Sequence, residues 1–330
     1  MEERINYDTQ FIDQSSGEII QIKGGTKLVS PERQLQQREY AVKSNQSFTE
    51  KNERYSETQK LRGNFFVALC QETELFCPEV SEPTLGKLIY LATYIDANNC
   101  ICHDGNWERQ DDDDNQRVKY IRNTIPMTKS EINTTLKISR QSFSPFWNEC
   151  ITKKLIIEND GAFFISKQIF RFCDNSGVNK KRTRMVKMFK HAIRYMYENT
   201  DERSKKTLVY LYKLIPFISL SHNGLCSNPF EEDKDKIKPL SLGQICKLFG
   251  IDRRNQIYFL KKLKKLRFID KEGKECSVIK YTWLYYDKDM YWITINPQFY
   301  SGYIKEKEMV ELVAEFRSKE IEIKEVNDND

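Results

Sequence analysis

The chain has 330 residues, of which 39% are hydrophobic, and its formal net charge is +5. This length is enough for two or three domains, and no apolar run reaches the roughly 18 residues that a membrane-spanning helix needs. The first residues lack the pattern of a signal peptide, and the nine cysteines are scattered among charged residues. We therefore expect a cytoplasmic protein with reduced, mostly buried thiols and no contact with a membrane.

The first 60 residues are predicted to form a hairpin followed by a polar, partly flexible arm. Two short apolar stretches flank Ser15-Ser16-Gly17, which is typical of a hairpin. Residues 26–60 are rich in Gln, Glu, Arg and Ser, and Ser30-Pro31 could equally begin a helix. From Asn64 onward the pattern indicates a compact domain, with a strand in "NFFVALC" and a helix over 83–95.

The next elements follow the order helix, turn, helix, hairpin. A polar loop that includes Asp111–Asp114 is expected between the helix over 83–95 and Pro126. Thr128 or Ser130 can cap a first helix, and Ser139 can cap a second helix whose Phe143, Phe146, Trp147 and Cys150 recur at core spacing. An Asn-Asp-Gly turn then predicts a hairpin over 155–166.

The same order returns later in the chain. Residues 239–269 align without gaps on residues 126–156, and the identical pairs are Pro126/Pro239, Ile132/Ile245, Ile138/Ile251, Arg140/Arg253, Phe146/Phe259 and Ile156/Ile269. We therefore predict a mainly α fold with β-hairpins, built as two tandem winged helix-turn-helix domains over 61–175 and 201–303. A basic connecting helix would span 176–200, and an acidic helix and tail would span 304–330.

The second helix of the second unit carries an unusual charge pattern. From Arg253 to Arg267 there are seven Lys or Arg and no Asp or Glu. We expect Ile257, Leu260, Leu263 and Leu266 to face the core, and Arg254, Tyr258, Lys261 and Lys265 to form an exposed stripe. In a helix-turn-helix protein the first turn of this helix meets base edges and its flanks meet phosphates. We predict that Arg253 and Arg254 contact bases and that Lys261, Lys262, Lys264 and Lys265 contact phosphates; a merely solvated face is the alternative.

The equivalent helix of the first unit has a different chemistry. Its predicted DNA contacts are Arg140, Gln141, Ser144 and Asn148. Pro145 would cost about 3 kcal/mol inside a helix begun at Ser139, unless Ser144 is the cap and the helix starts late. Between the two units, Lys180, Lys181, Arg182 and Arg184 would follow phosphates along the connecting helix, although a core helix with one wet face fits the pattern as well.

The sequence gives little support for catalysis or for a cofactor. Cys100, Cys102 and His103 resemble a fragment of a metal site, but the second ligand pair of a zinc site is missing. Asp111–Asp114 are expected to be a solvated loop. Glycine loops for phosphates and nucleophile motifs are not seen. We predict no metal, no cofactor and no enzymatic activity. The alternatives are a replication initiator or partition adaptor that recruits host proteins, a metal-dependent nuclease or recombinase, and a structural phage protein.

Two groups of stretches carry a family resemblance. They read "LIYLATYIDANN", "PMTKSEI", "LKISRQSF" and "LIIENDGAFFIS" in the first unit, and "LVYLYKLIPFI", "PLSLGQICKLFG" and "ITINPQFY" in the second. The chain resembles winged-helix proteins of phages and plasmids of low-GC Gram-positive bacteria, and the tandem arrangement is similar to plasmid replication initiators. The resemblance implies a nucleoid-associated protein that binds double-stranded DNA and controls transcription or replication, with a homodimer or host replication or transcription proteins as further partners.

Overall fold

The chain divides into two compact units, Met1–Ser56 and Glu57–Asp330. The computed structural model describes residues 10–12, 19–21, 63–70, 74–105, 107–112, 117–122, 124–172, 183–219, 222–231, 233–283, 291–302 and 306–317. In the first unit, strand β1 (Gln10–Ile12) pairs antiparallel with β2 (Ile19–Gln21), which confirms the predicted hairpin. The predicted arm over 26–60 lies outside the described residues.

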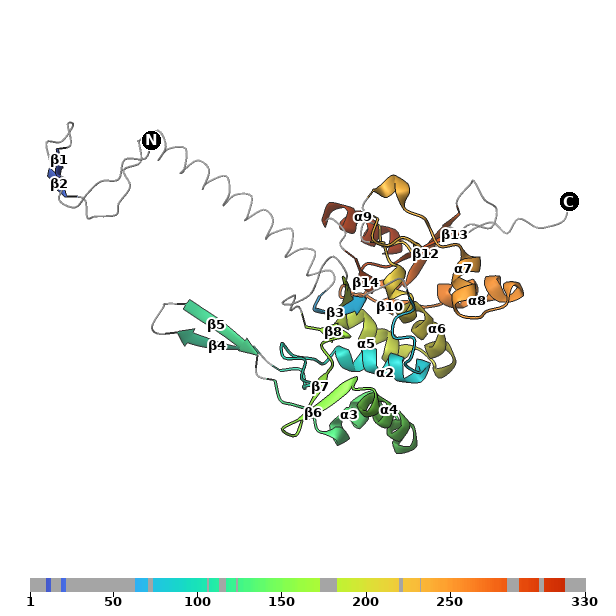
Figure 1. The fold of residues 1–330 in the computed structure, drawn as a ribbon, viewed down its shortest axis with the longest axis horizontal. Coiled ribbons are helices and arrows are strands. Elements are labelled where there is room, and N and C mark those ends of the chain that lie inside the picture. Colours follow the sequence, from blue (N-terminus) through green and yellow to red (C-terminus); the bar gives the residue numbers. More distant parts are fainter. Residues whose placement is uncertain are drawn as a thin grey trace. The chain divides into compact units, whose positions relative to one another are not determined.

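A four-stranded antiparallel sheet joins distant parts of the second unit. Its strands, in spatial order, are β14 (Tyr300–Ser301), β9 (Arg184–Phe189), β3 (Phe65–Cys70) and β8 (Phe170–Arg171). Figure 1 labels β14, β3 and β8 of this sheet. β3 and β9 form the centre, and Phe66, Ala68, Val186 and Met188 on them are fully buried. β3 precedes the first helix–helix–hairpin repeat and β9 precedes the second. Both repeats lie within Glu57–Asp330, and this sheet connects them.

The register of this sheet has an internal two-fold symmetry. β8 pairs with β3 at Phe170 and Ala68, and β14 pairs with β9 at Tyr300 and Met188, so Ala68 and Met188, 120 positions apart, hold equivalent places. In the central pair of strands, Phe65 pairs with Phe189 and Leu69 pairs with Met185. The shift of 120 positions relates Phe65 to Met185 and Leu69 to Phe189, so it converts one pair into the other. The two halves of the chain are therefore related by a pseudo-two-fold axis through the middle of the β3–β9 pair.

Two helices that pack against each other obey the same shift. α2 (Glu82–Ala92) follows Ser81, and α6 (Glu202–Lys213) follows Asp201, whose carboxylate accepts hydrogen bonds from the N–H groups of Arg203 and Ser204 at 3.0 Å. The short 3₁₀ helix η1 (Ile215–Phe217) continues α6. α5 (Lys190–Asn199) follows β9 directly and packs on α2.

The first helix–helix–hairpin unit forms where its local signals predict it. Its elements are α3 (Lys129–Leu136), α4 (Arg140–Thr152), β6 (Ile156–Asn159) and β7 (Ala162–Ile165). Thr128 and Glu131 form a reciprocal capping box, and the Ser139 hydroxyl accepts a bond from the Ser142 N–H at 3.2 Å. Asp160 and Gly161 have φ of 49° and 76°, so the predicted Asn-Asp-Gly turn is confirmed.

The second repeat has the same order of helix, helix and hairpin, and it carries a larger hairpin and a further one. Its elements are η2 (Lys234–Lys236), α7 (Leu242–Leu248), η3 (Arg253–Asn255), α8 (Gln256–Lys264), β10 (Arg267–Ile269), β11 (Glu275–Ser277), β12 (Ile279–Trp283) and β13 (Tyr291–Ile295). Ser241 and Gln244 form a capping box in the place of Thr128 and Glu131. Bridges Cys102↔Pro126 and Cys226↔Pro239 also occupy equivalent places, so the internal repeat is confirmed in structure.

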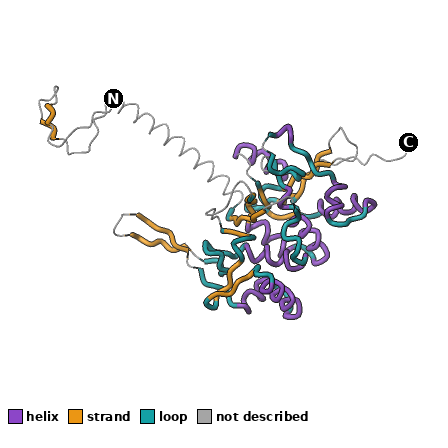
Figure 2. Tube along the Cα trace, in the orientation of Figure 1, coloured by secondary structure: helices purple, strands orange, loops and turns teal. Residues whose placement is uncertain are grey.

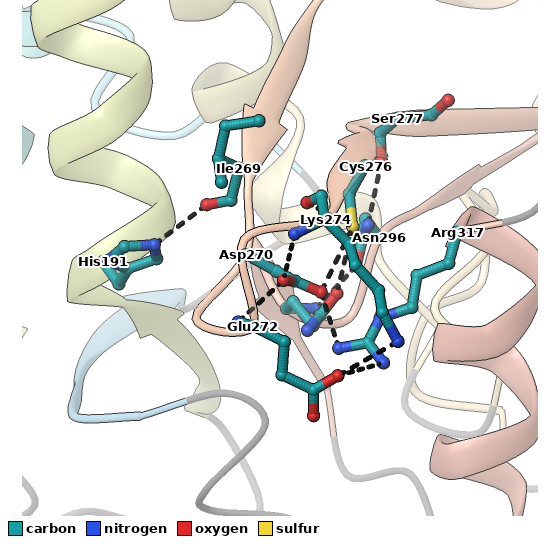
Figure 3. A network of polar contacts seen from close by, with 10 residues as sticks. His191, Ile269, Asp270, Glu272, Lys274, Cys276, Ser277, Asn296 and Arg317 are labelled. Carbon is teal, nitrogen blue, oxygen red and sulfur yellow. Dashed lines mark hydrogen bonds and ion pairs between the residues drawn. The ribbon is translucent and has the colours of Figure 1, made fainter.

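The C-terminal helix α9 (Glu306–Arg317) is fixed to the β10–β11 hairpin. Its Met309, Val313 and Phe316 are buried. Arg317 makes ion pairs with Asp270 at 2.5 Å and Glu272 at 3.0 Å, and both carboxylates lie in the turn of the hairpin (Figure 3). Asp270 also accepts bonds from the N–H groups of Glu272 and Lys274, so its buried carboxylate orders the turn and holds α9.

The predicted fold class is wrong. The described residues form a mixed α/β structure with a four-stranded sheet and five two-stranded antiparallel pairs besides the helices (strands orange and helices purple in Figure 2), so the chain is not mainly α with two tandem winged helix-turn-helix domains. The strand β3 lies where "NFFVALC" predicts one, but the sheet is not evident from the sequence, because β3 and β9 pair across about 120 residues. The domain boundaries expected within Glu57–Asp330 stay a prediction.

Two local predictions also need correction. The basic connecting helix begins only at Lys190, because Arg184–Phe189 form a strand with alternating burial. The expected polar loop contains the hairpin of β4 (Trp107–Asp112) and β5 (Arg117–Arg122), so Asp111 and Asp112 belong to a strand, and Asp113 and Asp114 lie outside the described residues. None of the described helices has the length and apolar character of a membrane span.

Candidate nucleic-acid interface

The α8 helix has one buried face and one exposed face. Phe259, Leu260 and Leu263 are buried, whereas Ile257 is 52% exposed, so the prediction that Ile257 faces the core is wrong. Residues spaced by three drift about 60° around an α-helix at each step, because three residues turn about 300°. A stripe from Ile257 through Leu260 to Leu263 therefore turns about 120° around α8 and cannot stay on one face; Leu266, beyond the C-cap Lys265, is buried as predicted.

A cluster of exposed basic and apolar side chains covers the other face, here named the α8 surface. It consists of Arg253, Arg254, Ile257, Tyr258, Lys261, Lys262 and Lys265, all exposed. A 3₁₀ turn starts this segment, and the Asp252 carboxylate caps it by accepting a bond from the Arg254 N–H at 2.8 Å. The predicted base-contacting arginines therefore lie in the first turn, and the predicted phosphate-contacting lysines lie in the turns that follow.

The side chains of the α8 surface are differently engaged. The Arg254 side chain is 90% exposed, and its Nε lies 3.2 Å from Asp252 Oδ1. Lys262 Nζ lies 4.5 Å from the ring centroid of Tyr258. Within the described ranges, Lys261 and Lys265 have no carboxylate at ion-pair distance.

Lys264 does not belong to this surface, although the sequence places it among the phosphate contacts. Its ammonium donates to the Tyr281 hydroxyl at 3.0 Å and lies 4.7 Å from the centroid of the same ring. Tyr281 is on β12, so Lys264 joins α8 to the large hairpin. Its role in the structure is to position α8.

The helix α4 presents an equivalent surface in the first unit. Arg140, Gln141, Ser144, Pro145 and Asn148 are all exposed and are here named the α4 surface. The helix starts at Arg140 and contains Pro145, which excludes the late start at Ser144. Because proline has no N–H, the Gln141 carbonyl loses its helical partner on the exposed side. The predicted contacts of the first unit thus share one face, together with an extra backbone acceptor.

Glu149 anchors α4 to the first turn of α2. Its carboxylate accepts bonds from the Ser81 N–H at 2.9 Å, the Ser81 hydroxyl at 2.5 Å and Lys153 Nζ at 2.9 Å. Burial alone would raise the pKa of Glu149, but the hydrogen bonds from Ser81 and Thr84 and the contact with Lys153 lower it to about 2. A carboxylate at a helix N-terminus is also favoured by the helix dipole. This contact sets the direction in which α4 presents its exposed face.

The two surfaces match in position but differ in chemistry. The alignment of the repeats places Arg140 with Arg253, Gln141 with Arg254, Ser144 with Ile257, Pro145 with Tyr258 and Asn148 with Lys261. Glu149, which anchors α4, corresponds to the exposed Lys262. The first surface is therefore polar with one arginine, whereas the second is strongly basic and has an apolar centre.

Arg184 is not on any surface, so its predicted contact with DNA is wrong. It is only 4% exposed, and its guanidinium donates to the carbonyls of Pro216, at 2.6 Å, and Ile218. The Phe230 ring lies 5.1 Å from the guanidinium carbon. Burial lowers the pKa of Arg184. Its partners are carbonyls that no local pattern could identify; Lys180, Lys181 and Arg182 lie outside the described residues.

The cysteine fragment is part of the core. Cys100 and Cys102 are buried, and burial followed by the hydrogen bond with Cys100 raises the pKa of Cys102 to about 12. His103 Nε2 lies 3.2 Å from Glu131 Oε1. Among the residues that the structure describes, no three His, Cys, Asp or Glu side chains gather as a metal site would require.

The candidate interface is supported by its geometry and its charge alone. The chain matches no family model, no curated protein and no solved structure.

Proposed function

We propose that the protein binds double-stranded DNA in a sequence-dependent manner, without catalysis of its own. The observation that carries this proposal is the α8 surface, where five exposed basic side chains follow one another between Arg253 and Lys265 without any intervening acid. Duplex DNA carries one negative charge per about 1.7 Å of its axis, so a row of lysines along a helix can neutralise several phosphates.

The arrangement of the charges supports a polyanionic partner over a solvated face. Lys261 and Lys265 are four residues apart on one helix, and such like-charged pairs destabilise a helix by about 0.2–0.5 kcal/mol. An ordinary surface helix relieves this repulsion with alternating acids, and α8 has none. A phosphate backbone would relieve it, because each ammonium would then lie beside an anionic oxygen.

The pseudo-two-fold symmetry supports a target with two parts. One chain carries both the α4 surface and the α8 surface, at equivalent places of its two halves. Arg140 suits guanine, whereas Gln141 and Asn148 suit adenine. Because the two surfaces differ at four of the five aligned positions, the two parts of the target would differ in sequence.

The resemblance of the two units to phage and plasmid proteins supports a role in a mobile element. In this proposal the protein acts in the bacterial cytoplasm and controls transcription or replication of that element. Recruiting host replication proteins to an origin, as an initiator does, is a second form of the same role. Sequencing the duplexes that the protein selects from a random pool separates the two, because direct repeats at an origin indicate an initiator and a promoter-proximal site indicates a regulator.

The proposal is tested by titrating a labelled duplex with the protein at 50 and 200 mM salt, with and without Mg²⁺. If six to ten phosphates are contacted, affinity should fall by about 10³–10⁵ over this range. Lys236→Ala is a suitable control for lysine variants of the α8 surface, because Lys236 is exposed, pairs with Asp233 and lies outside both surfaces. No retention of any duplex at low salt would refute DNA binding, and cleavage of the duplex with Mg²⁺ would refute the absence of catalysis.

A further inference from the structure

The α8 surface contains an apolar centre that its charges do not explain. Ile257 is 52% exposed and Tyr258 is 60% exposed, and both lie between the arginines of η3 and the lysines of the following turns. Leaving a large aliphatic side chain in water forgoes the gain of about 1.5–3 kcal/mol that its burial brings. Contacts with phosphates alone give no reason for an exposed aliphatic side chain at this place.

The two apolar side chains are not equivalent. Tyr258 is already covered on one side by Lys262, whose ammonium lies 4.5 Å from the ring centroid. Ile257 is half exposed among the residues that the structure describes, and it follows Arg253 and Arg254 by only one turn. It is therefore the exposed apolar side chain of α8 that lies closest in sequence to the residues predicted to contact base edges.

The ring of charge around Ile257 determines what can cover it. A purely apolar protein surface would desolvate the ammonium groups of Lys261 and Lys262 without supplying an anion to either, which is costly. In the major groove of duplex DNA the same docking would place the basic side chains beside phosphates and base acceptors. The apolar group exposed in that groove is the C5-methyl group of thymine, and aliphatic side chains contact it.

We infer that Ile257 is a specificity-determining residue that contacts the C5-methyl group of a thymine in the target of the α8 surface. This inference rests on the proposed DNA binding and adds the base that the second half of the chain prefers. The first half carries Ser144 at the equivalent position. A hydroxyl can bond to several bases, so the thymine preference would belong to the α8 half alone.

The test compares thymine with uracil, which differ only in that methyl group. The wild-type protein first selects duplexes from a random pool, and each thymine in the footprint of the α8 surface is then replaced by deoxyuridine. Removing a buried methyl group should weaken wild-type binding about fourfold at one or two positions, because a buried CH₂ group contributes about 0.8 kcal/mol and 1.4 kcal/mol is a factor of ten.

The matched variant is Ile257→Ser, which installs the residue of the first half. It should bind the thymine duplex about as weakly as the wild type binds the uracil duplex, and it should lose the distinction between the two. Its unfolding temperature should stay unchanged, because Ile257 is exposed. Ile125→Ser, which changes a 69% exposed isoleucine outside α8, should leave the distinction intact.

Three results would overturn the inference and leave DNA binding standing: a selected footprint without thymine, a wild-type affinity that ignores uracil at every position, or an Ile257→Ser variant as sensitive to uracil as the parent. If Ile257→Ser instead abolishes a concentration-dependent dimer in sedimentation while the uracil series stays flat, Ile257 contacts a second copy of the chain. If the wild type binds no duplex at low salt, both the inference and the proposed function fail.

Discussion

Asn99 and Asn223 make the same three hydrogen bonds in the two halves of the chain. The Asn99 amide nitrogen donates to the carbonyls of Ile165 and Phe170, and that of Asn223 donates to those of Ile295 and Tyr300. Each side-chain oxygen accepts one backbone N–H, from Phe172 in the first half and from Gly302 in the second. Each asparagine therefore ties a hairpin to the strand that enters the central sheet.

Replacing either asparagine should destabilise the protein strongly. Both are at most 1% exposed, and both have positive φ, of 68° and 57°. Alanine would leave two carbonyls and one N–H without partners in the core, at about 1–3 kcal/mol each, and would add backbone strain. We expect Asn99→Ala and Asn223→Ala each to lower the free energy of unfolding by about 3 kcal/mol or more.

Glycine variants separate the two causes. Asn99→Gly relieves the strain of the positive φ but still removes the hydrogen bonds, so it should recover only about 1 kcal/mol. Asn148→Ala, which changes an exposed asparagine, should have almost no effect. Urea unfolding of the four proteins measures these differences, and equal stability of Asn99→Ala and wild type would show that the shared bonds contribute nothing.

Arg317→Ala should release the C-terminal helix. The Asp270 side chain is 1% exposed and would lose its guanidinium partner, and removing one member of a buried ion pair costs about 3–5 kcal/mol. Lys280→Ala is the matched control, because the Lys280–Glu315 pair also joins α9 to the second unit but is 41% and 50% exposed. Its loss should cost less than about 1 kcal/mol.

The measurement is thermal unfolding combined with amide hydrogen exchange over α9. In the Arg317→Ala protein, exchange should accelerate between Glu306 and Arg317 and in the β10–β11 turn. Unchanged protection of α9 would mean that Met309, Val313 and Phe316 hold the helix without the ion pair.

Glu149 should make stability depend on pH in the acid range. Its pKa in the folded protein is about 2, below the usual value of 4.5, so the carboxylate contributes stability above about pH 5 and loses it as the pH falls toward 2. Glu149→Gln should therefore be less stable than wild type at pH 7, by about 2 kcal/mol, and the difference should shrink to nothing near pH 2. Urea titrations at several pH values measure this.

An exposed carboxylate gives the comparison for Glu149. Glu158→Gln, which changes an exposed carboxylate on the strand β6, should leave the stability at pH 7 unchanged. If Glu149→Gln and wild type run in parallel at every pH, then the contact with Ser81 does not stabilise the ionised carboxylate.

The arginines and lysines of the α8 surface should affect DNA binding differently. Arg253→Ala and Arg254→Ala should each cost about 1–3 kcal/mol and relax the base preference at one or two positions. Lys261→Ala and Lys265→Ala should weaken binding to all sequences alike and reduce the salt slope by about one each. Arg140→Ala should matter less, because the α4 surface carries fewer charges.

Binding of each variant to a matched and a scrambled duplex at two salt concentrations separates these effects. Lys264→Ala is informative here, since Lys264 bonds to Tyr281 and should change stability more than the salt slope. Arginine variants that bind both duplexes as the parent does would make the α8 surface an ordinary solvated face.

The parts of the fold that the sequence predicts are those whose causes lie within a few residues. The caps at Thr128 and Ser139 and the turn at Asp160-Gly161 depend on local hydrogen bonds and backbone angles, and all are observed. The central sheet depends on pairings between β3 and β9 that span about 120 residues, so no short window contains its signal. The basic residues of Arg184–Phe189 also hid the strand alternation.

The candidate site shows the same division. The exposure of Arg253, Arg254, Lys261 and Lys265 follows from helical periodicity. The inward direction of Arg184 depends on carbonyls from η1, and the diversion of Lys264 depends on Tyr281, so both need tertiary structure. The exposure of Ile257 is predictable from the sequence, because the angular drift of a three-residue spacing can be calculated.

The symmetric pairing of β3 with β9 has a consequence for what each half could become alone. Either strand would turn into an unprotected sheet edge if the other half were removed, and such an edge recruits a further strand. The pseudo-two-fold register means that β3 could pair antiparallel with β3 of a second copy in nearly the same geometry. A chain cut between the halves would thus tend to rebuild the sheet as a dimer, and the linkage of both halves in one polypeptide replaces that concentration-dependent association with an intramolecular one.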